Sequence, residues 1–526
     1  MDLNVCQRGS LSQGWNVGQS STHVLERLRK SKAFALFLFA VVVILLFADQ
    51  SLLAPNLSQV ADDFNFTNKE KDTLLAGYLP AAFFGFGAPA SLVIGWLTDV
   101  IDRRNLFVTV VVIGEIGALC SAFAITYSQL FWTRALTGIS VGGGIPLVYS
   151  LLGDMVGNSE RTNASGLIGI SMGLGQGLGQ IVAGFMGSCT PLGWRLPFIL
   201  VAVPCLVLAV VVLVATRDPP RGRLEEGLQD HFKSGGDYKE RPTLSTLRKL
   251  AGTPTVWAVL LQGLPGCVPW GVLWAYLNDF LHKQRDLSVQ SATMVVTAFG
   301  LGSAFGQLLG SKVGQELYNR HPVLQPILMA VTTFLGVFPC LMLIEYTDGS
   351  LVAYYVFASV GGFVASVTGP NVKAILMNVT LPSTRGTAFG VYNLFDDLGR
   401  GLGPGIVSIL VARMGREPTF VLAMYAWIFC AVILLSMTWT VQRDERKVQE
   451  HLREYARVHA SSVDEELVGN AHVSHDKDET LSADAAAATF EWAHARVDNG
   501  VEDGVHPRGR GSYQSISGNS PLDVAT

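Results

Sequence analysis

Twelve long apolar segments recur along the chain, and they constrain its fold more than any other feature of the sequence. A bilayer core about 30 Å thick is crossed by about 20 apolar residues of helix, and each segment reaches that length. The pattern predicts an all-α membrane protein with twelve transmembrane helices. The segments cover residues 33–54, 73–98, 105–126, 128–152, 162–189, 195–216, 254–281, 290–314, 322–345, 351–378, 384–412 and 416–441.

The overall composition points to the same class of protein. Of the 526 residues, 49% are hydrophobic and only 15% are charged, whereas a soluble domain carries about 25% charged residues. The net charge of −4 gives no overall basic field that could hold a nucleic acid. The seven cysteines show no spacing typical of disulfides or of a metal site. We therefore expect a protein that faces lipid, binds no nucleic acid and holds neither a metal nor a cofactor.

The basic residues indicate the orientation, because positively charged loops stay cytoplasmic. With both termini inside, about 24 lysines and arginines lie on the cytoplasmic side and about 7 on the other. We therefore expect the N- and C-termini to be cytoplasmic. The predicted regions are an N-terminal tail (1–32), a six-helix bundle (33–216), a cytoplasmic interbundle loop (217–253), a second six-helix bundle (254–441) and a disordered acidic tail (442–526).

The two halves of the chain resemble each other weakly. Arg161-Thr-Asn-Ala-Ser-Gly begins the fifth segment, and Arg385-Gly-Thr-Ala-Phe-Gly begins the eleventh, 224 positions later. Two pseudo-symmetric bundles imply transport by alternating access. Glycine rows, such as the one at every fourth position from Gly302 to Gly314, predict close packing between helices. The sequence has no phosphate-binding Gly-x-x-x-x-Gly-Lys-Ser/Thr, which argues against an ATP-driven pump.

The loop after the second segment reads Gly95-Trp-Leu-Thr-Asp99-Val-Ile-Asp102-Arg103-Arg104. A glycine for close helix contact, a carboxylate at a helix end and two arginines can form a latch that stabilises one of two access states. The spacing Gly-x-x-x-Asp-x-x-x-Arg-Arg resembles the signature loop of the major facilitator superfamily.

The fourth segment supports this resemblance. Arg134-Ala-Leu-Thr-Gly138 is similar to the fourth-helix motif of the superfamily, and Asp154 stands where the family places a partner for the loop arginines. The resemblance covers about residues 33–441. It implies the major facilitator fold, in which the first, fourth, seventh and tenth helices line a central cavity. The loop after the eighth segment has Gly314 in place of the aspartate, so we expect the latch to lie mostly in the N-terminal half.

Within the superfamily the chain resembles the spinster-like group of lipid and lysolipid transporters. Asp49 in Phe47-Ala-Asp49-Gln50 is similar to the first-helix Asp-Arg of that group. Gln50 replaces the arginine, and Val141 stands where the group has a fourth-helix glutamate. Proton coupling by that glutamate therefore does not carry over to this chain.

Ionisable residues within apolar segments suggest transport or coupling sites, because a charge at mid-bilayer costs at least about 2.5 kcal/mol. Asp49 is the best candidate for a proton carrier, since burial disfavours the charged form of a carboxyl group. The alternative is a fixed ion pair between Asp49 and Arg134. Asp396 and Arg400 are four residues apart and suit either a structural pair or a coupling role. The candidate coupling and cavity residues are Asp49, Arg134, Lys373, Asp396, Asp397 and Arg400, with Glu115 as a further intramembrane carboxyl group.

The seventh segment offers candidates for binding a substrate. Pro265 and Pro269 interrupt it, and interrupted helices free backbone groups at binding sites. Trp270 and Trp274 lie on one helix face and could stack on a substrate; alternatively, they are aromatic residues at the membrane interface. The substrate-binding candidates are Gln262, Trp270, Trp274, Gln176 and Asn393.

These observations predict a monomeric secondary active transporter rather than an enzyme. We expect proton-coupled transport of a lipid, another amphiphile or a small organic solute. The alternatives are a sugar, organic anion or drug-type substrate, or a transporter-like sensor or scaffold without transport. Asn65-Phe-Thr67 is a candidate glycosylation site. Tyr513-Gln-Ser-Ile516 resembles a sorting signal, which leaves the plasma membrane and the endosomal or lysosomal membrane as expected locations.

Overall fold

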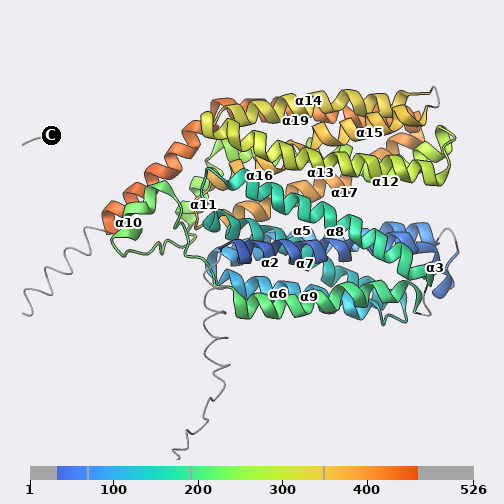
Figure 1. Cartoon of the computed structure of the whole chain (residues 1–526), viewed down its shortest axis with the longest axis horizontal. Helices are drawn as coiled ribbons and strands as arrows, with labels where there is room; N and C mark the ends of the chain where they lie inside the picture. The colour runs from blue at the N-terminus through green and yellow to red at the C-terminus, as the bar shows by residue number, and fades with distance from the viewer. Residues whose placement is uncertain (1–31, 68–69, 190–191, 348–349, 460–526) are drawn as a thin grey trace, which may run out of the picture. The chain divides into compact units, whose positions relative to one another are not determined.

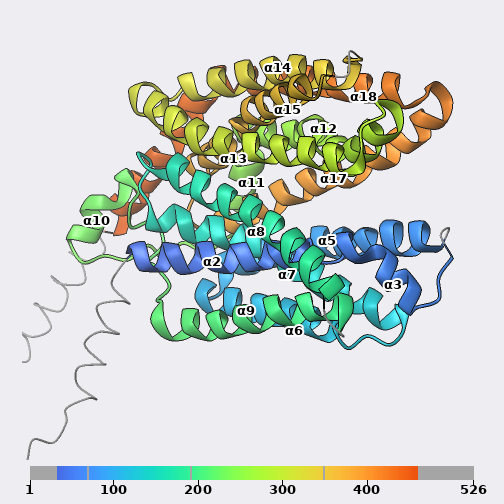
Figure 2. The same ribbon diagram turned by 45° about the vertical axis from the view of Figure 1, so that its right-hand side comes forward.

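The computed structural model describes residues 32–67, 70–189, 192–347 and 350–459, and every regular element in these ranges is helical. Figures 1 and 2 show the helices in two views. They belong to one compact unit that ends at Arg457. The predicted N-terminal tail up to residue 31, the sorting signal and the tail beyond residue 459 lie outside the described residues.

The N-terminal bundle contains the helices of the first six predicted segments. They are α2 (Lys32–Gln50), η1 (Ala54–Asn56), α3 (Leu57–Asp63), η2 (Lys71–Tyr78), α5 (Leu79–Val100), α6 (Arg103–Ser121), α7 (Tyr127–Met155), α8 (Arg161–Cys189), η3 (Gly193–Arg195) and α9 (Leu196–Ala215).

The C-terminal bundle contains the helices of the other six segments. They are α12 (Pro254–Gln284), α13 (Val289–Arg320), α14 (Leu324–Glu345), α15 (Leu351–Ser366), α16 (Thr368–Asn378), α17 (Arg385–Met414), α18 (Arg416–Met424), α19 (Ala426–Ser436) and η5 (Met437–Trp439).

Eleven helices in the described ranges are long and apolar enough to cross a membrane. Helix α17 has 30 residues but carries Asp396, Asp397 and Arg400 at its middle, which makes it too polar for that criterion. Because α17 packs against α5, α7 and α12, Asp396 and Asp397 are buried inside the molecule, whereas the Arg400 side chain is 46% exposed. The predicted all-α membrane fold is confirmed, and α17 is its twelfth long helix.

Side chains mark several helix ends. The Asp102 side chain caps α6 by accepting a hydrogen bond from the Asn105 N–H. Thr126 and Gln129 form a reciprocal capping box at the start of α7. Gly415 separates α17 from α18 with a φ of 86°, a conformation that favours glycine.

Close packing within each bundle depends on glycine. A Cβ atom added at Gly138 of α7 would lie 2.1 Å from the Phe83 carbonyl oxygen of α5. In the second bundle, added Cβ atoms at Gly302 and Gly306 of α13 would lie 2.1 and 2.0 Å from carbonyl oxygens of α15. The predicted packing role is therefore confirmed for these rows. Gly173 and Gly177 of α8 instead have open space beside them.

The two bundles meet through α5 against α17, α8 against α13 and α16, and α7 against α17. Among the described residues, hydrogen bonds and glycine contacts between the bundles lie at the middle of these helices or toward the ends next to residues 217–253. We call those ends the loop face. This conformation is closed at the loop face.

Residues 217–253 and the chain after η5 form an additional layer at the loop face. The interbundle segment contains η4 (Glu226–Leu228), α10 (Gln229–Lys233) and α11 (Leu244–Ala251). Residues 441–459 continue as a helix, which Figure 1 shows beside α10. The expectation of a disordered tail from residue 442 is therefore wrong for residues 442–459. The reason is that this helix has apolar partners, in a cluster of Leu228, Tyr238, Leu381, Val448 and Leu452.

Candidate functional site

The signature loop forms the core of a charged network at the loop face. Arg103 is completely buried and forms ion pairs with Asp154 of α7 and with Asp218 of the interbundle segment. Its guanidinium group also donates to the Pro219 carbonyl oxygen over 2.6 Å. Arg104 stays within the N-terminal bundle, where it donates to the Thr216 carbonyl oxygen over 3.3 Å. The two arginines of the motif therefore have different partners.

Asp99 links the bundles by capping the first turn of α17. Its carboxylate accepts hydrogen bonds from the Gly386 N–H over 2.8 Å and from the Thr387 N–H and hydroxyl group over 2.7 Å each. The first turn of a helix has unsatisfied N–H groups and a partial positive charge, so a carboxylate from another helix is stabilising there. Gly95 allows the approach, because a Cβ atom on it would lie 2.6 Å from the Gly386 carbonyl oxygen.

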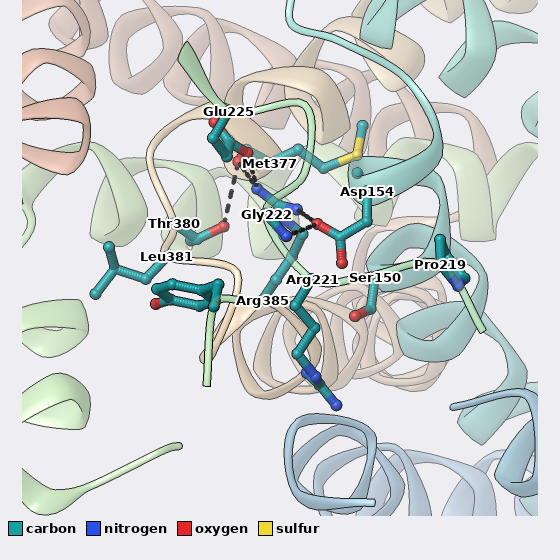
Figure 3. Close-up of polar contacts among 12 residues, drawn as sticks. Ser150, Asp154, Pro219, Arg221, Gly222, Glu225, Met377, Thr380, Leu381 and Arg385 are labelled. Atoms are coloured by element: carbon teal, nitrogen blue, oxygen red, sulfur yellow. Dashed lines mark hydrogen bonds and ion pairs between the residues drawn. The ribbon is translucent and has the colours of Figure 1, made fainter. Parts of the chain in front are cut away.

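Asp154 joins the signature loop to the C-terminal bundle. One carboxylate oxygen pairs with Arg103, and the other accepts a hydrogen bond from Arg385 over 3.0 Å. The second oxygen also accepts the Gly222 N–H over 3.0 Å. Figure 3 shows Arg385 lying between Asp154 and Glu225.

Glu225 of the interbundle segment binds an arginine from each bundle. Its Oε1 accepts hydrogen bonds from Arg161 and, over 2.7 Å, from Arg385. Its Oε2 accepts from Gln449 on the helix over residues 441–459, over 2.9 Å. Burial raises the pKa of Glu225, but the charges of Arg161 and Arg385 outweigh this effect and hold it at about 2. Glu225 is therefore ionised throughout the physiological range.

The arginine contacts repeat with the internal symmetry of the chain. Arg161 donates to the Gly153 carbonyl oxygen, and Arg385 donates to that of Met377, in each case eight residues earlier. Each arginine also reaches the other bundle. Arg161 donates to Asn378 over 3.0 Å, and Arg385 donates to Asp154.

The sequence predicts a gating loop of Gly95, Asp99, Arg103, Arg104 and Asp154. The structure brings four of these residues into the network, and Arg104 lies at its edge. The roles of Asp218 and Glu225 in this network are not predicted by the sequence, because polar residues in a loop follow no helical period. Arg161 and Arg385 stand out in the sequence as repeated motifs, but nothing there marks them as contacts between the bundles. Their repetition at the start of equivalent helices was the available signal.

Asp49 and Arg134 pair inside the N-terminal bundle. Arg134 Nη1 lies 3.1 Å from Asp49 Oδ1, and Nη2 donates to the Asp49 carbonyl oxygen over 3.1 Å. Both residues are buried. The guanidinium carbon also lies 5.6 Å from the centre of the Phe83 ring and 5.4 Å from that of Phe198. This conformation therefore contains the ion pair that was one of the two expectations for Asp49.

A central cavity of about 50 Å³ lies between the bundles, enough for roughly three or four water molecules. Its walls differ in chemistry. The N-terminal bundle supplies mostly apolar side chains and glycines, and the C-terminal bundle supplies charged and polar groups. The lining residues are Phe47, Gln50, Phe83, Phe84, Gly87, Gly138, Val141, Gly142, Ile145, Met172, Lys373, Tyr392, Asn393, Asp396, Asp397 and Arg400.

The charged wall has internal pairing. Arg400 lies 3.3 Å from Asp396 and 3.9 Å from Asp397. Asn393 donates to Asp397 over 3.0 Å. Lys373 forms no ion pair with the described residues, and its ammonium group lies 5.2 Å from the centre of the Tyr149 ring. Lys373 is therefore the basic residue of this wall that has no ion-pair partner among the described residues.

The other substrate candidates lie elsewhere. Trp270 packs against Phe299 and Trp427, and Trp274 is 49% exposed. Gln262 is buried and donates to the Val259 carbonyl oxygen. The described residues that line the cavity do not include Trp270, Trp274, Gln262 or Gln176. Of that group, only Asn393 is a cavity residue.

Asn65 is exposed and lies directly after α3, at the ends of the helices opposite the loop face. It has a φ of 55°, a left-handed conformation in which asparagine is several times more frequent than most residues. The sequon is therefore accessible in the folded protein.

Comparison with known proteins defines the family. The family model described as Major Facilitator Superfamily matches residues 39–404. The chain belongs to the Major Facilitator Superfamily and is a multi-pass membrane transporter, and the resemblance to spinster-like members is confirmed.

Among curated proteins, the chain is 26% identical over 370 residues to a probable 4-methylmuconolactone transporter of Cupriavidus pinatubonensis, covering 68% of this chain and 79% of the relative. It is 22% identical over 452 residues to protein spinster homolog 1 of Xenopus tropicalis, covering 80% and 83%.

Solved structures share the fold. A bacterial homolog of the human lysosomal transporter Spinster, in an inward-facing and unoccupied conformation, matches with a TM-score of 0.54 at 18% identity over 78% of this chain and 98% of that one. A proton:xylose symporter matches with a TM-score of 0.63 at 16% identity, covering 78% and 96%.

Proposed function

We propose that this transporter is a secondary active carrier for an amphiphile with an anionic group, moved by alternating access and coupled to protons. The observation that carries the proposal is the unequal wall of the central cavity. Apolar side chains from one bundle face charged and polar side chains from the other. An amphiphile satisfies both walls, because its apolar part removes apolar surface from water and its charged group meets partners that are already in place.

Lys373 sets the preferred charge of the substrate. Arg400 already has two carboxylate neighbours, whereas Lys373 has the Tyr149 ring. An anion brought next to Lys373 therefore gains a charge-assisted contact without breaking an ion pair. A lysolipid with an anionic headgroup and a smaller apolar organic anion share this chemistry.

The loop-face network serves in this proposal as the gate. The bundles can part at the loop face only if Asp99 leaves the first turn of α17 and the arginines leave their partners in the opposite bundle. The present cavity is too small for an amphiphile, so loading requires a wider conformation. With the loop face cytoplasmic, as the distribution of basic residues indicates, the gate faces the cytoplasm. We also propose that the protein is a monomer and that it resides in the plasma membrane or in an endosomal or lysosomal membrane.

The test of the substrate class uses thermal unfolding of the purified full-length protein, because binding to the folded state raises the melting temperature. Lysophosphatidylglycerol should stabilise the wild type, while monoacylglycerol with the same chain should stabilise it much less. A short aromatic carboxylate distinguishes lipid from small-anion binding. The variant Lys373→Ala should lose the stabilisation, and Lys312→Ala, an exposed lysine at the loop face, should keep it. Equal stabilisation of both variants would overturn the proposal.

Proton coupling is proposed to pass through Asp49. In liposomes, uptake of fluorescent lysophosphatidylglycerol should rise with an imposed pH gradient in the wild type and lose that response in Asp49→Asn. An unchanged gradient response in the variant would exclude Asp49 as the carrier. A sensor without transport would show no uptake in either protein, and removal of residues 460–526 would abolish its cellular effect.

A further inference from the structure

Glu115 is a buried carboxyl group that neither the gate nor the cavity uses. It lies on α6 and is 1% exposed. Both of its oxygens are buried and accept no hydrogen bond from the described residues, apart from the nearby Cys205 thiol on α9. A charged carboxylate without a strong donor is very costly in an apolar interior, whereas its protonated form is far less so.

The surroundings of Glu115 connect it to the Asp49–Arg134 pair. The titratable and charged groups that face it are Asp49 on α2, Arg134 on α7 and Cys205 on α9. With both carboxyl groups ionised, Asp49, Glu115 and Arg134 would carry a net charge of −1 in a buried site. With one proton on the two acids, the net charge is zero.

The observed hydrogen bonds assign that proton in this conformation. Arg134 donates to both carboxylate oxygens and to the carbonyl oxygen of Asp49. The ionised carboxylate is therefore that of Asp49, and the proton belongs to Glu115. Removing the proton from Glu115 without moving Arg134 would leave an uncompensated buried charge, which is strongly unfavourable.

We propose that Glu115 is a second proton-carrying group of the N-terminal bundle, which exchanges one proton with Asp49 as Arg134 moves between them. In the conformation seen, Glu115 holds the proton and Asp49 holds Arg134. When Arg134 turns to Glu115, the O–H bond of Glu115 breaks and an O–H bond forms on Asp49. The sum of the three charges stays at zero throughout. This inference rests on the proton coupling proposed above and adds a second site to it.

The first experiment measures the infrared absorption of protonated carboxyl groups in purified full-length protein at neutral pH. Glu115→Gln should remove one component, and Glu115→Asp should restore it at a shifted frequency. Asp49→Asn should also remove it, because Glu115 is then the acidic group left beside Arg134 among the described residues, and Glu115 ionises. Glu160→Gln, at an exposed position on the loop face, should change nothing. If the signal persists in either Glu115→Gln or Asp49→Asn, the proposal is wrong.

The second experiment separates this inference from the proposed function. Uptake of fluorescent lysophosphatidylglycerol driven by a pH gradient should fall about tenfold in Glu115→Gln, while uptake without a gradient should change less than about twofold. An unaltered gradient response in this variant would refute the role of Glu115 even if the wild type is proton-coupled. If wild-type uptake ignores the gradient, the coupling proposed for this transporter fails, and the infrared result alone decides the protonation of Glu115.

Discussion

Arg161 and Arg385 occupy equivalent positions in the two bundles and donate hydrogen bonds to the same atom, Oε1 of Glu225. Each also bonds a side chain of the opposite bundle at a matching position, Asn378 for Arg161 and Asp154 for Arg385. The two contacts are related by the internal repeat, and Glu225 lies between them. The conformation closed at the loop face therefore depends on a residue that belongs to neither bundle.

Replacing Glu225 by alanine should open the loop face. The change leaves two fully buried arginines without their shared carboxylate, and breaking a buried ion pair costs about 3 to 5 kcal/mol. The closed conformation should lose population by more than about 100-fold relative to the open one. Hydrogen–deuterium exchange at residues 153–161 and 385–390 should become faster. Glu316→Ala, which removes an exposed ion pair with Arg320, should leave exchange there unchanged. Equal protection from exchange in both variants would contradict the role of Glu225 in keeping the loop face closed.

Gly390→Ala should destabilise the contact between α5 and α17. A Cβ atom at this position would lie 2.5 Å from the Ser91 carbonyl oxygen, so the helices would have to separate. Overpacking of this kind costs about 1 to 3 kcal/mol and should lower the melting temperature. Gly173→Ala is the matched control, because open space surrounds Gly173 and alanine favours a helix by up to about 1 kcal/mol. The two glycine variants should therefore shift the melting temperature in opposite directions. A shift in the same direction would contradict the close contact proposed to depend on Gly390.

Docking of the helix over residues 441–459 should weaken as pH rises. Burial raises the pKa of Glu445 on this helix to about 7, although the Tyr318 hydroxyl group donates to its carboxylate. Because the folded pKa lies above the ordinary value of 4.5, docking is strongest below that value and becomes weaker as pH rises through about 7. Hydrogen exchange of this helix, corrected for the intrinsic rate, should therefore be faster at about pH 8.5 than at about pH 5.5. Glu445→Gln should reduce the dependence to the part that comes from the ion pair of His451 with Glu240, and Glu450→Gln, at an exposed position, should retain it in full.

Asn65 should carry a glycan when the protein is made on a eukaryotic secretory route. Asn65→Gln should then increase mobility on a denaturing gel to that of the enzymatically deglycosylated wild type. Asn163, in the sequon Asn163-Ala-Ser165, is exposed at the loop-face end of α8, so Asn163→Gln tests the opposite side of the membrane. A mobility change in Asn163→Gln but not in Asn65→Gln would reverse the proposed orientation.

The sequence was sufficient for the features that lipid dictates. Segments long enough to cross a bilayer predicted the helices, and α17 was recognised despite Asp396, Asp397 and Arg400 because its flanks are apolar. The signature loop led to Asp99 and Arg103, since their spacing fixes them at the end of a helix. Small residues at regular spacing predicted the packing rows that include Gly302 and Gly306.

Contacts between distant segments could not be predicted in the same way. The network at Glu225 brings together residues from α8, α17, the interbundle segment and the helix over residues 441–459. The residue pattern of each segment is independent of the others, so it does not indicate which segments meet. Trp270 and Trp274 share a helix face, and both pack against Phe299, while Trp274 stays 49% exposed. A helical period identifies residues on one side of a helix, but not what that side meets.

Asn378 and Asp154 are 224 positions apart, the same offset that separates Arg385 from Arg161. One copy of the repeat therefore has a neutral side chain where the other has an acid, and Glu225 restores the negative charge. Surface loops usually tolerate insertions and replacement by other sequences, because the entropy cost of closing a loop rises only slowly with its length. That tolerance should not extend to residues 218–227. A flexible substitute of equal length would keep the two halves joined but leave their arginines with too little negative charge to stay together.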